Sequence, residues 1–89
     1  MHAAIVRVTI KDREKAEKNL KEQIVPNASQ APGFVTGHWV NLGGEGTGMV
    51  VFESEDAAKQ WAESAQGAAP PAEIVTIDKM EVGEVVAQA

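Results

Sequence analysis

Residues 32–58 read PGFVTGHWVNLGGEGTGMVVFESEDAA, and most of the architecture follows from them. Their β-branched and aromatic residues predict two strands, over 34–42 and 49–52, joined by a glycine-rich hairpin loop. Ser54 predicts the N-cap of a helix, because its hydroxyl can accept a backbone hydrogen bond. Glu55 and Asp56 then suit the positive end of the helix dipole. This stretch therefore predicts a strand, a hairpin, a second strand and a helix in succession.

The residues before this stretch predict a strand and a helix. Residues 3–10 form an alternating pattern that places Ala4, Val6, Val8 and Ile10 on one face of a strand. Asp12 predicts the N-cap of the first helix. The apolar stripe of that helix recurs every four residues, at Ala16, Leu20, Ile24 and Ala28. Because Pro26 interrupts this pattern, we expect a kink or a new short turn there.

The residues after position 58 complete the pattern. The second helix has an apolar stripe of Ala58, Trp61, Ala62 and Ala65, and Gly67 predicts its C-terminal cap. Residues 74–86 predict the last strand, bent or bulged near Gly83. The order β-α-β-β-α-β predicts an α+β fold, a ferredoxin-like sandwich with a four-stranded antiparallel sheet. With 89 residues, the chain should form one domain over residues 1–89.

Composition excludes several classes of function. A net charge of −5 opposes binding to phosphate backbones, so we expect no nucleic-acid partner. The absence of cysteine removes disulfides, thiolate nucleophiles and cysteine-rich zinc sites, and two separated histidines give no metal-site spacing. No apolar run approaches the about 20 residues of a membrane helix, and the N-terminus does not have the pattern of a signal peptide. We therefore expect no membrane association and a cytoplasmic location.

The predicted sheet is apolar on both faces, although two helices can cover only one. In the strand over 34–42, Phe34 and Val40 share one face, while Val35 and Trp39 share the other. An uncovered apolar face of this kind marks an interaction surface. The simplest closed arrangement is a two-fold homodimer with the two sheets packed face to face. The residues expected in this interface are Ile5, Arg7, Trp39 and Val51.

With these features the chain resembles the dimeric α/β-barrel superfamily, in particular small proteins similar to antibiotic biosynthesis monooxygenases (ABM-like proteins). The resemblance is carried by Pro32-Gly33-Phe34, Gly37-His38-Trp39, the run from Val50 to Ala58, and Val82-Gly83-Glu84-Val85-Val86. It implies ferredoxin-like protomers that pair into a dimeric α/β barrel. Members of the superfamily include cofactor-free oxygenases acting on polyketide aromatics or quinols, haem-degrading enzymes, and many proteins without a known activity.

The residues used by the haem-degrading members are absent from this chain. Those enzymes use an asparagine in the first strand and a tryptophan in the third, at positions that correspond to Val6 and Phe52. They also use a histidine beyond the second helix, and no histidine follows His38 here. The resemblance therefore implies no haem degradation and no cofactor. Two functions stay open: an ABM-like protein that binds a small aromatic or apolar ligand and oxygenates it without a cofactor, or a non-catalytic dimeric ligand-binding, accessory or stress-related protein.

Three aromatic or ionisable positions are candidates for the site. If Val40 faces Val50 across the hairpin, His38 lies opposite Phe52 on the helix-covered side, where it would act as a general base. The alternative is a half-buried structural histidine. Phe52 and Trp61 are expected to form the walls of an aromatic ligand pocket, with a plain core role as the alternative. Trp39 has the opposite parity to His38, which assigns it to the dimer interface.

Overall fold

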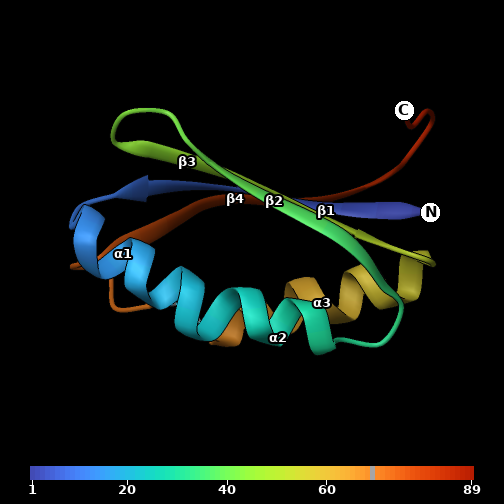
Figure 1. Cartoon of the computed structure of the whole chain (residues 1–89), viewed down its shortest axis with the longest axis horizontal. Helices are drawn as coiled ribbons and strands as arrows, with labels where there is room; N and C mark the ends of the chain where they lie inside the picture. Colours follow the sequence, from blue (N-terminus) through green and yellow to red (C-terminus); the bar gives the residue numbers. More distant parts are fainter. Residues whose placement is uncertain (69) are drawn as a thin grey trace.

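The computed structural model describes residues 1–68 and 70–89. Its elements follow one another as β1 (His2–Ile10), α1 (Arg13–Asn19), η1 (Leu20–Ile24), α2 (Val25–Gln30), β2 (Phe34–Asn41), β3 (Glu45–Phe52), α3 (Glu55–Gly67) and β4 (Val75–Glu84). The segments α1, η1 and α2 run on without a break as one helix (Figure 1). The βαββαβ order predicted from the sequence is thereby confirmed.

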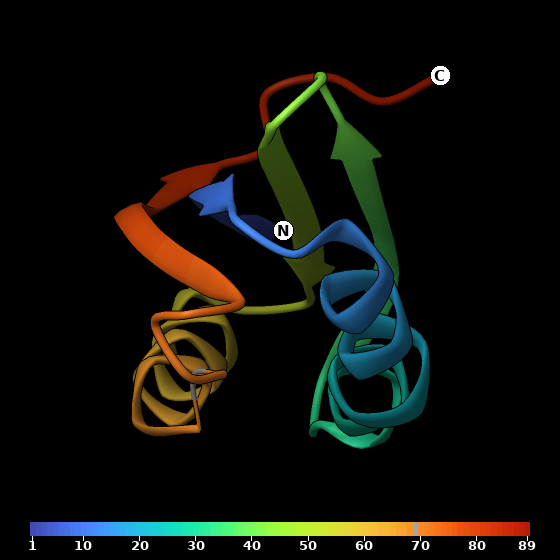
Figure 2. The same cartoon turned by 90° about the vertical axis from the view of Figure 1, so that its left-hand side faces the viewer.

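The four strands form one antiparallel sheet in the order β2-β3-β1-β4. Both helices lie side by side on the same face of this sheet, which makes a structure of two layers (Figure 2). The helix-covered face carries Ala4 of β1 and Val50 and Phe52 of β3, all fully buried. We call the opposite face, which carries Ile5, Arg7, Met49 and Val51, the outer face. No helix among the described residues is long and apolar enough to cross a membrane.

The first helix changes its hydrogen-bonding pattern just before Pro26. Asp12 caps its start by accepting a 3.2 Å hydrogen bond from the Lys15 amide, as predicted. Further along, the Val25 amide donates to the carbonyl of Leu20, five residues earlier, which makes η1 a π-helical turn. Proline lacks an amide hydrogen, and its ring presses on the carbonyl four residues before it, so the regular pattern cannot continue unchanged. The helix continues through Pro26, with α2 beginning at Val25, so the irregularity expected there takes the form of a π-helical turn just before the proline.

Several boundaries differ from the sequence prediction. Strand β3 begins at Glu45, four residues before the predicted start, because Gly46 and Gly48 belong to the strand and not to the hairpin loop. The bulge expected near Gly83 lies elsewhere: the register of β4 against β1 shifts between Arg7 and Val8. Helix α3 includes Gly67 and has Ala68 at its C-cap, where the Ala68 amide donates to Ser64.

The facing of β2 is the main error of the sequence prediction. Phe34 pairs with Phe52, but the register then shifts, so that His38 pairs with Met49 and Trp39 pairs with Gly48. The prediction that His38 lies opposite Phe52 on the helix-covered side is therefore wrong, as is the placement of Trp39 on the outer face. The physical reason is one extra residue between Phe34 and Thr36, which reverses the alternation of side chains in the rest of the strand.

Candidate functional site

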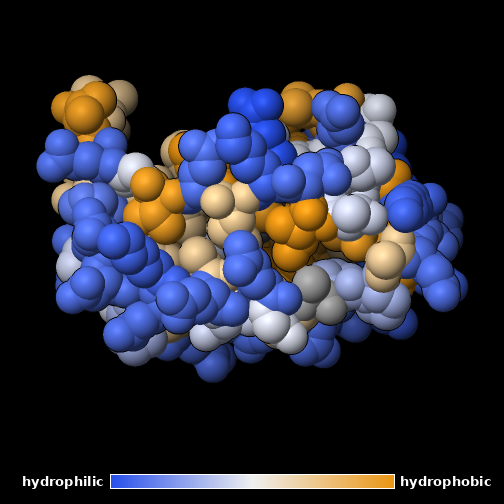
Figure 3. All heavy atoms as spheres, turned by 180° about the vertical axis from the view of Figure 1, so that it is seen from behind, coloured by the Kyte–Doolittle hydropathy of each residue, from blue (hydrophilic) through white to orange (hydrophobic). Residues whose placement is uncertain are grey.

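A cavity of about 910 Å³ lies between the helix-covered face of the sheet and the two helices. This volume is in the range of pockets that hold small ligands. Apolar atoms line the hollow where it opens between the sheet and the helices (Figure 3). The wall contributed by the sheet consists largely of Val6, Val8, Trp39, Ile77 and Met80. The sheet side of the cavity, which we call its floor, is therefore mostly hydrocarbon and aromatic surface.

Trp39 lies across this floor because glycines leave room for its ring. A Cβ atom at Gly37 would lie 2.8 Å from the Trp39 ring, and one at Gly48 would lie 2.7 Å from it. Real Cβ atoms do not approach other atoms so closely, so the indole ring rests directly on the backbone of both strands. A side chain at either position would push the ring toward the helices. Gly37 and Gly48 thus fix a flat aromatic surface in the cavity.

The second indole comes from α3. Trp61 lines the cavity with 8% of its surface exposed, and its ring tilts against that of Phe52 at a centroid distance of 5.9 Å. Phe52 itself is fully buried and does not line the cavity. It packs behind Trp61 and contacts Phe34 edge to face at 6.2 Å. Of the two predicted wall residues, Trp61 borders the cavity, while Phe52 supports it from behind.

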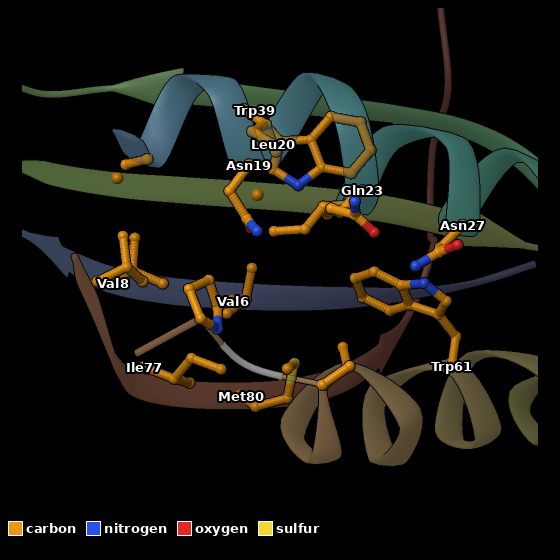
Figure 4. A pocket seen from close by; sticks show the side chains of 18 of the residues that line it. Val6, Val8, Asn19, Leu20, Gln23, Asn27, Trp39, Trp61, Ile77 and Met80 are labelled. Atoms are coloured by element: carbon orange, nitrogen blue, oxygen red, sulfur yellow. The ribbon is translucent and has the colours of Figure 1, made fainter. Parts of the chain in front are cut away.

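The helix that crosses over Trp39 supplies a row of polar lining residues, and further polar side chains come from the sheet and α3, namely Asn41, Thr47, Gln60 and Ser64. Leu20 and Ile24 line the cavity together with Asn19, Gln23 and Asn27, which recur at every fourth residue. The side chains of these three point from the helix toward the cavity (Figure 4). The π-helical turn falls within this stretch, and such turns are frequent at functional sites. Sequence reasoning missed these residues, although their spacing of four was visible next to the apolar stripe.

Ionisable side chains are scarce around this cavity. In the described part of the chain, Glu17 and Lys21 are the titratable residues that line it, both from the first helix. Glu17 already accepts a 3.1 Å hydrogen bond from Arg13 Nε. His38 is exposed beside Met49 on the outer face, so the structure does not bring it together with Phe52 and Trp61. The cavity therefore lacks the histidine base that the sequence prediction placed there.

The outer face brings together three of the four predicted interface residues. Ile5 is 37% exposed and Arg7 is exposed, whereas Val51 lies on the same face but is only 7% exposed. Met49, 42% exposed, continues the apolar surface onto β3. Trp39 is the exception, because it faces the helices.

A small ionic cluster joins the start of β1 to the start of α3. Lys59 Nζ donates a 2.8 Å hydrogen bond to Glu55 Oε1, and His2 Nε2 lies 3.4 Å from Glu55 Oε2. The Lys59 hydrogen bond, together with its positive charge, holds the pKa of Glu55 below its ordinary value of 4.5. The same contact raises the pKa of Lys59. Glu55 and Lys59 are exposed, and none of the three residues lines the cavity.

Comparison with known proteins bears on the fold. No protein-family model and no curated protein matches this sequence. Among solved structures, MupZ from Pseudomonas fluorescens is similar with a TM-score of 0.68 at 20% identity, over 91% of this chain. The chain spans 65% of MupZ, less than two thirds of its length.

Two further structures match over the whole chain. HapK from Hahella chejuensis has a TM-score of 0.69 at 12% identity, and 96% of its chain is covered. A dimeric ferredoxin-like protein from an uncultured marine organism has a TM-score of 0.62 at 12% identity, with 98% of its chain covered. Likeness at these identities concerns the fold. The chain therefore has a ferredoxin-like fold, as its order of helices and strands predicts.

Proposed function

We propose that this protein binds a small aromatic or otherwise apolar ligand in the cavity between its sheet and its helices. The observation that carries the proposal is the pair of indole rings, Trp39 and Trp61, on the lining of a cavity of about 910 Å³. Flat rings pack well on indoles in offset or edge-to-face arrangements. A ligand that buries about 200 Å² of apolar surface there would gain about 5 kcal/mol before the costs of association.

Binding without catalysis is the better supported of the two functions left open by the sequence. A base that takes a proton from a substrate must lie within hydrogen-bond reach of it. Among the described residues that line the cavity, Glu17 and Lys21 are the ionisable ones, and Glu17 is engaged by Arg13. With His38 on the outer face, no lining histidine supports a base-assisted oxygenation.

We also propose that two protomers pair through the outer face. Ile5, Met49 and Val40, which is 53% exposed, present apolar side chains there. The hairpin between β2 and β3 and the C-terminal segment both rise on this side of the sheet, away from the helices (Figure 1). One of the similar structures is described as dimeric, which supports pairing of two protomers here. Face-to-face packing would remove this apolar surface from water.

The binding proposal can be tested with N-phenyl-1-naphthylamine, a neutral aromatic probe whose fluorescence rises in apolar sites. We expect saturable fluorescence with the wild-type protein. Ala65 lines the cavity from α3, so Ala65→Phe should fill part of the space and weaken probe binding by about tenfold or more. Gln66→Phe is the matched control, because Gln66 is exposed on the same helix and does not line the cavity. Equal binding by both variants, or no binding by the wild type, would contradict the proposal.

A further inference from the structure

The carboxamides of Asn19, Gln23 and Asn27 form a row along the cavity. The positions differ by four residues each, which brings them to the same side of the helix. A rise of about 1.5 Å per residue spreads the row over roughly 12 Å from Asn19 to Asn27. Figure 4 shows all three side chains directed from the helix toward the cavity, with Trp39 and Trp61 in the same view. The row therefore follows the long direction of the helix that roofs the aromatic floor.

These amides have free hydrogen-bonding capacity. None of the three donates to or accepts from another side chain or a backbone group within the described residues. Gln23 and Asn27 are exposed, and Asn19 is half-buried, so water can serve all three while the cavity holds no ligand. Each carboxamide offers an acceptor oxygen and two N–H donors. A bound molecule could replace these waters with direct hydrogen bonds along one of its edges.

The sheet side of the cavity is more apolar. Val6, Val8, Ile77 and Met80 line it with apolar atoms, and its polar side chains are Asn41, which already accepts from the Gly43 amide, and Thr47. A charged ligand would lose hydration against this wall, and its counter-charges could come only from Glu17, already engaged by Arg13, and Lys21, whose exposure to water screens the attraction. The sheet side is thus mainly apolar and aromatic, whereas the first helix carries the row of carboxamides together with Glu17 and Lys21.

We infer that Asn19, Gln23 and Asn27 determine the specificity of the site, by selecting an elongated neutral ligand with hydrogen-bonding groups along one long edge. This inference rests on the proposed function, since it concerns the same cavity. The indole rings supply affinity for any flat molecule of the right size, whereas the carboxamide row discriminates between flat molecules. A ligand without such groups would leave the amides facing hydrocarbon, which costs binding free energy.

The test compares three probes by quenching of tryptophan fluorescence. 1,8-Dihydroxyanthraquinone carries three oxygen atoms along one long edge, which can accept hydrogen bonds from the amide N–H groups. Anthracene carries no polar group, and anthracene-2-carboxylate carries a charge. We expect 1,8-dihydroxyanthraquinone to bind about tenfold more tightly than anthracene, and the carboxylate more weakly than either. Gln23→Met and Asn27→Leu should each weaken the dihydroxyanthraquinone about three- to tenfold and leave anthracene unchanged.

Gln30→Met is the matched control for Gln23→Met, because Gln30 is exposed on α2 and does not line the cavity. It should change the affinity for none of the probes. Equal binding of anthracene and dihydroxyanthraquinone, or an equal loss for both in the Gln23→Met variant, would overturn the inference but leave the proposed function intact. If none of the neutral probes quenched the tryptophan fluorescence, the proposed function itself would fail.

Discussion

The indole of Trp39 rests on the backbone of Gly48, its partner on the neighbouring strand. A Cβ atom at Gly48 would lie 2.7 Å from Trp39 Cδ1 and 2.9 Å from its Nε1. Gly46 and Gly48 are thus part of β3, where they line the cavity, and do not belong to the hairpin loop. Their lack of a side chain is what allows a large aromatic ring to lie flat on the sheet.

The first prediction follows from this contact. Gly48→Ala should force the Trp39 ring off the sheet, because the new methyl group would also lie 2.9 Å from Val6 Cγ1. Overpacking of this kind destabilises folded proteins by about 1–3 kcal/mol. Urea unfolding would measure the loss of stability, and a change in the tryptophan emission spectrum, to which Trp39 and Trp61 both contribute, would report the displacement. The affinity for the naphthylamine probe should fall in parallel.

Gly67→Ala serves as the control for this substitution. Gly67 ends α3, and a Cβ atom there would meet no atom within 4 Å. Alanine has a higher helix propensity than glycine, so this variant should be as stable as the wild type or slightly more stable. If Gly48→Ala were equally harmless, the Trp39 ring would not lie where the structure places it.

The second prediction separates His38 from Trp39. His38→Ala should leave probe affinity unchanged, because His38 is exposed on the outer face beside Met49. Trp39→Leu should weaken an aromatic probe about three- to tenfold, since it removes a stacking surface from the cavity. Titrations of both variants with the same probe would measure the difference. A loss of affinity in His38→Ala that matched the loss in Trp39→Leu would contradict the observed facing of β2.

Oxygen consumption with an anthrone substrate extends this comparison to catalysis. The cavity contains no lining histidine in the described part of the chain, so His38→Ala should not slow any turnover that occurs there. A marked decrease in oxygen uptake by this variant would restore the role as a base that the sequence suggested.

Regular patterns in the sequence predicted the order of the helices and strands. They did not predict which way the side chains of β2 face, because that depends on a local irregularity of the strand. Asp12 and Ser54 mark both helix starts because capping depends on a few adjacent residues, and both caps are present. The facing of His38 and Trp39 depends instead on one extra residue near Val35. The alternation of side chains with a period of two residues does not reveal where an extra residue falls. One extra residue moves every later side chain of the strand to the opposite face.

The carboxamide row shows a second limit of the sequence. Asn19, Gln23 and Asn27 look like ordinary polar positions on an amphipathic helix, since the pattern shows their spacing but not what lies opposite them. They become candidates for ligand recognition because the structure places their helix over Trp39, at a cavity of about 910 Å³. Trp61, in contrast, was found because a large aromatic residue on an apolar stripe must point inward.

The third prediction concerns the outer face. Met49→Asp should disrupt the proposed homodimer, because it replaces an exposed apolar side chain of the outer face by a carboxylate that would lose its hydration on burial. We expect the dimer dissociation constant to rise by more than about tenfold. Light scattering coupled to size-exclusion chromatography over a range of concentrations would measure it. Gln66→Asp on the exposed surface of α3 should change nothing, and a wild-type protein that is already monomeric at micromolar concentration would refute the dimer.

The last prediction concerns pH and the ionic cluster at the start of α3. Because Lys59 holds the pKa of Glu55 below 4.5 in the folded protein, the ionised carboxylate stabilises the fold above that pH. This contribution is lost as the pH falls below 4.5 and through the lower folded-state pKa, where Glu55 takes up a proton. Glu55→Gln should therefore lower the melting temperature slightly at pH 7 and leave it nearly unchanged near pH 2. The effect should be small and weakened by salt, since Glu55 and Lys59 are exposed. Glu63→Gln, on the exposed surface of the same helix, is the control; if both variants lost the same stability at every pH, the Lys59 contact would contribute nothing.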